Sequence, residues 1–171
     1  MSRLGRRQRL ALTLATTVAC LFAAAASASI FQSPDGLFTV EFPGAPKLWV
    51  ADGRTARGTG FEERRWSVAT KDGYFSVTAF VYAKPQKTDF DAAASAAAAG
   101  ARGRVVAVEP IRQGEVDGRE IAIDCGASGF LRERIMSVGG VFYVVLFQGA
   151  DATSAKAAAV DEFLISFEAA G

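Results

Sequence analysis

The chain has 171 residues with 19 basic and 18 acidic side chains, and it contains no histidine. This length is enough for one domain with a substantial core but not for two. The absence of histidine removes the usual general base near neutral pH and the commonest ligand of transition metals. We therefore expect a non-enzymatic protein and assign no catalytic, cofactor-binding or metal-binding residue.

The first 28 residues have the parts of a secretory signal peptide. Four arginines precede an apolar stretch that begins near Leu10 and ends in small residues, and we expect cleavage after Ala28. Loss of these arginines leaves 15 basic against 18 acidic residues, a net charge of −3. A slightly acidic exported protein is a poor match for nucleic acid or anionic lipid. The sequence therefore predicts a periplasmic or secreted protein.

Three other interpretations of this segment stay open. The apolar stretch approaches the length of an uncleaved membrane anchor. Arg6 and Arg7 form a twin-arginine pair, although Arg9 stands where that signal usually has an apolar residue. "TVAC" resembles a lipoprotein cleavage box, which would lipidate Cys20. Cleavage after Ala28 would instead remove Cys20, leaving Cys125 alone and excluding an internal disulfide.

Residues 30–84 predict two hairpins separated by a loop. Around a Pro-Asp-Gly turn, residues 30–42 form two short strands whose apolar positions Phe38, Val40 and Phe42 face the core. The stretch "ADGRTARGTG" at 51–60 predicts a flexible basic loop because of its three glycines. "FEERRWSVAT" and "YFSVTAFVYAK" flank "KDG" and predict the second hairpin.

The rest of the chain predicts a helix, four strands and a closing helix. Residues 88–101 are rich in alanine, with Thr88 as the expected N-cap and Asp91 completing a capping box. Strands follow between 104 and 147, the last two joined by a Gly-Gly turn, and the apolar run 141–147 belongs at the middle of the sheet. Residues 151–167 predict an amphipathic helix capped by Asp151.

Several segments resemble the PsbP-like family of secreted bacterial domains. They are "DGLFTVEFPGAPK", "VDGREIAID", "LRERIMSVGGVFYVVLFQG" and "AAAVDEFLISFEA", in the family's order over most of residues 30–169. The resemblance implies a single α+β domain, an α/β/α sandwich whose central, mostly antiparallel sheet is flanked by helices. It also implies a role in binding other proteins, without catalysis. Fold alone assigns no function.

The sequence supports two kinds of function. The first is an accessory domain that binds a protein of the cell envelope, and the alternative is a small-molecule or lipid carrier with a pocket between sheet and helix. An enzyme based on Cys125 is disfavoured because Asp124 would raise the pKa of its thiol. Six arginines are candidates for partner contacts, although they could equally pair with Glu62, Glu63 or Glu133; they are Arg54, Arg57, Arg64, Arg65, Arg132 and Arg134.

Overall fold

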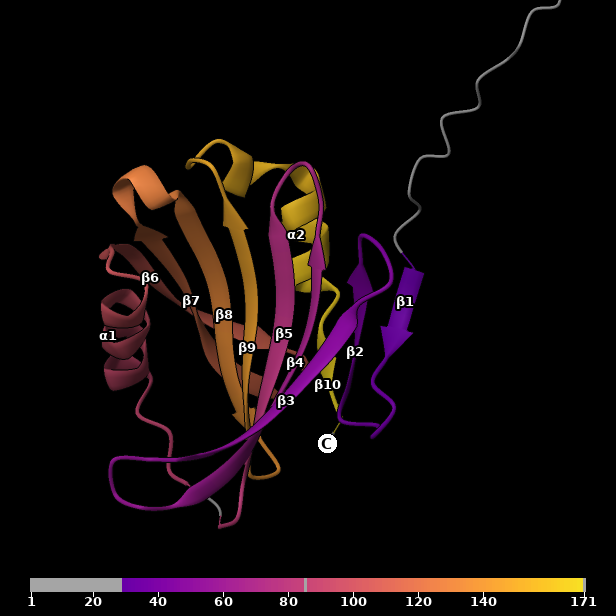
Figure 1. Ribbon diagram of the computed structural model, residues 1–171, viewed down its shortest axis with the longest axis vertical. Helices are drawn as coiled ribbons and strands as arrows, with labels where there is room; N and C mark the ends of the chain where they lie inside the picture. Colours follow the sequence, from indigo (N-terminus) through magenta and orange to yellow (C-terminus); the bar gives the residue numbers. More distant parts are fainter. Residues whose placement is uncertain (1–28, 85, 171) are drawn as a thin grey trace, which may run out of the picture.

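The computed structural model describes residues 29–84 and 86–170 and is mostly β (Figure 1). Strands make up 53% of the described residues and helical turns 18%, with ten strands in two sheets and two α-helices. The expected α/β/α sandwich is therefore wrong. Two short helices are too few to form a layer over each face of so wide a sheet. The signal peptide predicted at 1–28 lies outside the described residues.

Seven antiparallel strands form the main sheet. Its central strand is the apolar run of residues 141–147, as predicted, because this strand has three neighbours on each side. In spatial order the strands are β3 (Lys47–Arg54), β4 (Gly60–Ala69), β5 (Tyr74–Tyr82), β9 (Val141–Gly149), β8 (Phe130–Val138), β7 (Val116–Asp124) and β6 (Arg104–Gln113). Gly139 and Gly140 adopt positive φ angles of 60° and 81° in the β8–β9 turn, which confirms the predicted tight hairpin.

A small second sheet and two helices complete the fold. The small sheet contains β1 (Ser29–Gln32), β2 (Phe38–Phe42) and β10 (Glu168–Ala169). The helices are α1 (Phe90–Gly100) and α2 (Ala158–Ile165), with 3₁₀ turns at Gly126–Ser128 and Ser154–Lys156. No helix in the described ranges has the length and apolar character needed to cross a membrane.

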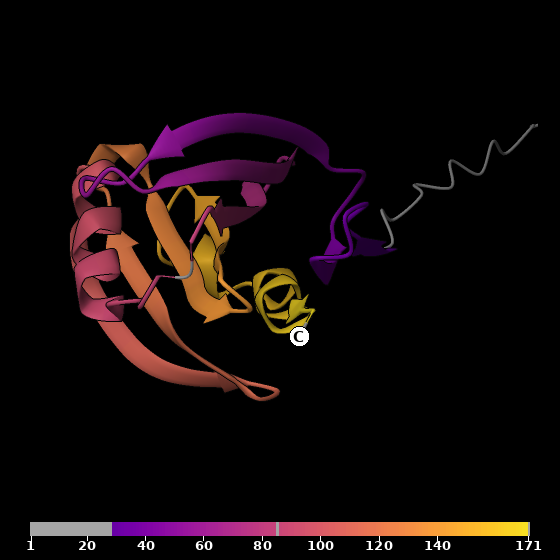
Figure 2. The same ribbon diagram turned by 90° about the horizontal axis from the view of Figure 1, so that it is seen from below.

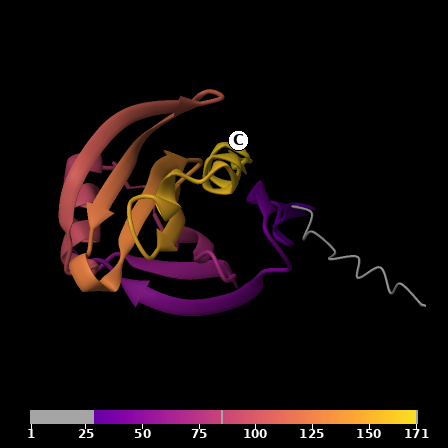
Figure 3. The same ribbon diagram turned by 90° about the horizontal axis from the view of Figure 1, so that it is seen from above.

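The main sheet curls strongly, so that it wraps around α2 (Figures 2 and 3). Its concave face packs against α2 and the small sheet in an aromatic core. Phe38, Val40 and Phe42 are at most 1% exposed, which confirms their predicted inward orientation. The Tyr143 hydroxyl donates a hydrogen bond to the Leu37 carbonyl oxygen at 3.0 Å and ties the central strand to the small sheet.

Helix α1 lies on the outer, convex face against β6 and β7 (Figure 2). Ala94 and Ala98 are buried against a cluster that includes Ile121 and Ile123, so small side chains permit close packing. The N-cap is Asp89, not Thr88: its side chain accepts a hydrogen bond from the Ala92 amide at 3.0 Å.

Two other local predictions need correction. Residues 47–54 form strand β3, so the loop expected over 51–60 is much shorter. The closing helix is also shorter than expected, because Asp151 accepts hydrogen bonds from the amides of Thr153 and Ser154 and so holds the 3₁₀ turn instead of capping α2.

Candidate functional site

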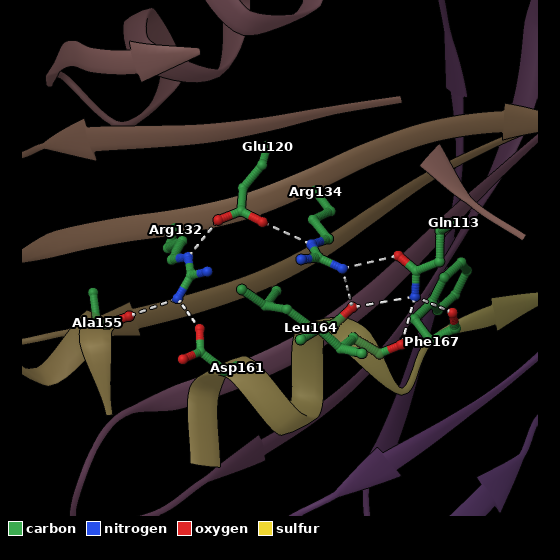
Figure 4. Close-up of polar contacts among 9 residues, drawn as sticks. Gln113, Glu120, Arg132, Arg134, Ala155, Asp161, Leu164 and Phe167 are labelled. Atoms are coloured by element: carbon green, nitrogen blue, oxygen red, sulfur yellow. Dashed lines mark hydrogen bonds and ion pairs between the residues drawn. The ribbon is translucent and has the colours of Figure 1, made fainter. Parts of the chain in front are cut away.

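Arg132 connects strands β7 and β8 to the segment that leads into α2 (Figure 4). Its Nε donates to Glu120 Oε1 at 2.6 Å, and its Nη1 donates to Asp161 Oδ1 at 2.5 Å and to the Ala155 carbonyl oxygen at 3.1 Å. Burial alone would lower the pKa of this guanidinium, but the hydrogen bonds to Glu120 and Asp161 outweigh that effect and raise it. Arg132 is thus held as a cation by two carboxylates.

Arg134 extends the same network toward the end of α2. Its Nε donates to Glu120 Oε2 at 2.8 Å, and its Nη1 donates to Gln113 Oε1 at 3.1 Å and to the Leu164 carbonyl oxygen at 3.2 Å. Gln113 Nε2 in turn donates to the carbonyl oxygens of Ile165, at 2.7 Å, and Phe167. The last carbonyl groups of a helix have no hydrogen-bond donors within the helix, and here Arg134 and Gln113 of the sheet act as the donors. The network fastens α2 to the concave face.

Glu133 is not a partner of these arginines, contrary to one of the pairings that the sequence left open. Successive side chains of a strand point to opposite faces, so Glu133 lies on the convex face between Ile121 of β7 and Leu146 of β9. It is 3% exposed, and among the described residues its Oε1 has no hydrogen-bond partner. Burial raises the pKa of this carboxyl to about 7.

A pocket of about 350 Å³ adjoins the Arg132 end of the network. Apolar side chains of Ala107, Ala122 and Phe130 contribute to its lining from the sheet, and Ala155 contributes from the 3₁₀ turn. Charged groups also line it, among them Glu120, Arg132 and Asp161, which already bind one another. This pocket lies between the sheet and the segment that leads into α2. A second pocket of about 370 Å³ lies at the alanine-rich α1, where Ala92 and Ala93 line it together with Tyr82 of β5 and Phe142 of β9.

Arg64 and Arg65 pair with acidic neighbours, as the sequence allowed. Arg64 donates to Asp35 Oδ2 at 2.6 Å and to Glu62. Burial would raise the pKa of Asp35, but hydrogen bonds from Ser33, Arg64 and the Leu37 amide, together with the charge of Arg64, outweigh burial and lower it. Arg65 donates to Glu63, and its guanidinium carbon lies 5.1 Å from the centre of the Trp49 ring. The two arginines stabilise the β3–β4 region.

The two arginines of the glycine-rich segment do not form one site. Arg54 Nη1 donates to the Gly58 carbonyl oxygen at 3.2 Å and closes the β3–β4 turn. Arg57 lines an open pocket of about 450 Å³ with Lys87, Asp89 and Arg119 near the start of α1. Asp89 is already engaged as the helix cap, so this pocket contains no uncompensated helix terminus.

Cys125 lies beside the 3₁₀ turn after β7 and is partly buried. Burial raises the pKa of its thiol, and the negative charge of Asp124 raises it further, as predicted from the sequence. A raised pKa disfavours the thiolate, which is the nucleophilic form. In the part of the chain that the structure describes, no three Cys, Asp or Glu side chains gather in a way that could hold a metal ion.

The structure also presents a feature that the sequence reasoning missed: strand β3 is an open edge of the main sheet (Figure 2). Leu48, Trp49 and Val50 are consecutive and are 51%, 50% and 49% exposed. Among the described strands, β3 pairs with β4 alone, in continuous register from Lys47 to Arg54. We call residues 47–54 with their unpaired backbone side the β3 edge. The signal in the sequence was "LWV", three large apolar residues in succession.

Comparison of the chain with protein-family models, with curated proteins and with solved structures finds no match. The resemblance to the PsbP-like family therefore stays a prediction. The fold and the site define a curled antiparallel sheet that is covered on its concave face by α2 and the small sheet. It has two edge strands, β3 and β6, and β3 carries the exposed apolar run.

Proposed function

We propose that this chain is an exported, non-enzymatic domain that acts through protein–protein contacts in the cell envelope, and that the β3 edge makes these contacts. The observation that carries the proposal is the run of three half-exposed apolar residues, Leu48, Trp49 and Val50, on an unpaired edge strand. A long apolar edge strand is a template for pairing with another chain, and proteins normally protect such edges.

The opposite edge of the same sheet is protected. β6 has a register shift between Val105 and Ala107, and it contains Pro110, which has no backbone N–H to donate. The outer strands of the small sheet are short, with four residues in β1 and two in β10. β3 has eight residues, with neither a proline nor a register shift. β6 therefore contains a proline and a register shift, whereas β3 contains neither and has only the charged residues Lys47, Asp52 and Arg54 at either end of its apolar run.

The exposed apolar side chains point to both faces of the sheet. Alternation places Trp49 on one face and both Leu48 and Val50 on the other. A partner lying on one face would leave the other exposed, whereas a strand added in the plane of the sheet would cover both. The β3 edge thus suits strand addition, in which backbone hydrogen bonds supply affinity and side chains supply specificity.

The remaining chemistry of the chain supports a binding role. The sequence has no histidine, and the thiol of Cys125 has a raised pKa. The candidate arginines, apart from Arg57, bind carboxylate or carbonyl groups of the same chain. Contacts of this kind stabilise the fold.

Site-specific photo-crosslinking in the native host tests the contact surface. A photoreactive amino acid at position 49 should give discrete protein adducts, while the same group at position 108 on the protected edge should give none. Val108 is a matched control because it is 42% exposed in an edge strand. Absence of any adduct at position 49 would refute the proposed surface.

Export is tested separately by cell fractionation and N-terminal sequencing. The signal-peptide interpretation predicts a mature chain that starts at Ser29 and is recovered with periplasmic or secreted proteins. A lipidated N-terminus at Cys20 would support the lipoprotein interpretation instead. An intact N-terminus recovered with the cytoplasmic fraction would contradict export.

A carrier is the second candidate, supported by the 350 Å³ pocket at α2. Its volume lies at the lower limit for a site that takes a small molecule. Native mass spectrometry of protein purified from its host would detect a retained ligand as added mass. A ligand that is lost from a variant with Ala122→Phe, which fills the pocket, would favour the carrier; apo protein alone would count against it.

A further inference from the structure

We infer that the strand taken by the β3 edge is β3 of a second copy of this chain, so that the exported protein is a two-fold dimer with a continuous sheet across the interface. This inference rests on the proposed function, because it names the occupant of the same edge. A two-fold contact uses one surface patch twice, so the patch must be complementary to itself. The β3 edge meets that condition in one register.

Strand geometry restricts the possible registers. Opposed residues of an antiparallel pair lie on the same face of the sheet, and side chains alternate between faces along each strand. In a two-fold pair, odd-numbered residues must therefore oppose odd-numbered ones, and one residue must oppose its own copy. The exposed apolar run offers three such centres, at Leu48, Trp49 and Val50.

Only the register centred on Trp49 matches apolar residues on both faces. It sets Trp49 against its own copy on one face and Leu48 against Val50 of the second copy on the other. Lys47 then opposes Ala51 of the second copy, so no like charges meet. Centring on Val50 would set Leu48 against Asp52 of the second copy, and centring on Leu48 would set Lys47 against Trp49.

The local sequence also limits the length of the interface. Pro46 precedes β3 and lacks a backbone N–H, so the added ladder ends there. In the register centred on Trp49, the paired segment is therefore residues 47–51 of each copy. An interface of this size suits a reversible dimer, one that forms as concentration rises.

Cysteine crosslinking tests the register directly. The full chain is expressed for export with Cys20→Ser and Cys125→Ser, so that it has no other thiol whether or not the first 28 residues are removed, and Trp49→Cys or Ala51→Cys is added. Two opposed residues at position 49 have Cα atoms about 4.5–5.5 Å apart, within reach of a disulfide. Copies of position 51 lie four residues apart along the paired strands, about 13 Å, which is out of reach. Mild oxidation should crosslink the first variant and not the second.

Sedimentation equilibrium tests the dimer without a new cysteine. The unmodified protein should approach twice the mass of one chain as its concentration rises. Trp49→Lys, which sets two positive charges against each other, should remain at the mass of one chain, while Val108→Lys on the other edge should dimerise like the parent. Circular dichroism checks that both variants keep the native fold.

The outcomes separate this inference from the proposed function. A parent protein that stays at the mass of one chain at all concentrations overturns the dimer, as does equal crosslinking at positions 49 and 51. If such a monomer still gives adducts from position 49 with a different envelope protein, the proposed function stands with another occupant. A monomer without any adduct at that position overturns both.

Discussion

The free energy of unfolding of the parent protein should depend on pH because of the buried Glu133 carboxyl, and replacement of Glu133 by glutamine should abolish this dependence. The carboxyl group is 3% exposed between apolar neighbours, and burial raises its pKa to about 7 from an ordinary value of 4.5. The folded state therefore holds a proton that the unfolded state releases between pH 4.5 and 7. The contribution of the Glu133 carboxyl to the stability of the fold is therefore fully present below pH 4.5 and is lost as the pH rises through 7.

The size of the effect follows from the shift in pKa. Each pKa unit corresponds to 1.36 kcal/mol, so the free energy of unfolding should fall by about 3 kcal/mol between pH 4.5 and 8. A 3% exposed group has almost no solvent to screen this cost. Glu133→Gln has a similar shape and does not titrate, so its stability should stay nearly constant over the same range.

Urea unfolding monitored by tryptophan fluorescence measures both curves, since buried Trp66 reports on the core. Glu115→Gln is a suitable control, because the Glu115 side chain is 92% exposed and should leave the parent curve unchanged. If the difference in stability between the parent and Glu133→Gln is the same at pH 5 and pH 8, Glu133 does not titrate as its burial requires.

Three further variants test the network, the cap and a glycine. Glu120→Ala should cost ~3 kcal/mol in urea unfolding, because it leaves two partly buried arginines short of their shared carboxylate, while Glu115→Ala should change little. Asp89→Ala should cost about 1 kcal/mol by loss of the α1 cap, and Thr88→Ala should cost less, which helical circular dichroism during melting can check. Gly129→Ala should prevent native folding or lower the melting temperature sharply, because the residue has a φ of 100° and its new Cβ would lie 2.2 Å from the Gly149 carbonyl oxygen.

Strands with one buried face could be predicted from the sequence. Phe38, Val40 and Phe42 of β2 alternate with partly exposed residues because one face of this strand packs into the aromatic core and the other does not. β3 gives no such signal, since both of its faces are exposed along "KLWVADGR". Gly53 also favoured the wrong prediction of a loop over residues 51–60, because glycine is common in turns. In the structure it lies inside β3, where a Cβ atom would lie 2.3 Å from the Phe61 ring.

The network at α2 could be predicted only in part. Alternation along β8 correctly places Arg132 and Arg134 on one face and Glu133 on the other. Their partners depend on register and curvature, because Glu120 arrives from β7 and Asp161 from a helix enclosed by the curled sheet. Local sequence contains neither quantity. The α/β/α sandwich that the family resemblance implied is wrong for a different reason, because the described residues contain ten strands and only two α-helices.

The curvature of the sheet and the proposed contact surface are connected. A sheet that closes into a barrel has no edges, whereas this sheet stops short of closure and must manage two. At β6 the chain does so with a register shift and Pro110. At β3 it has uninterrupted pairing potential beside exposed Trp49. Incomplete closure explains why the main sheet has two edges. It does not explain why β6 has a register shift and a proline while β3 has an exposed apolar run and neither of these features. That asymmetry is why we seek the function at β3.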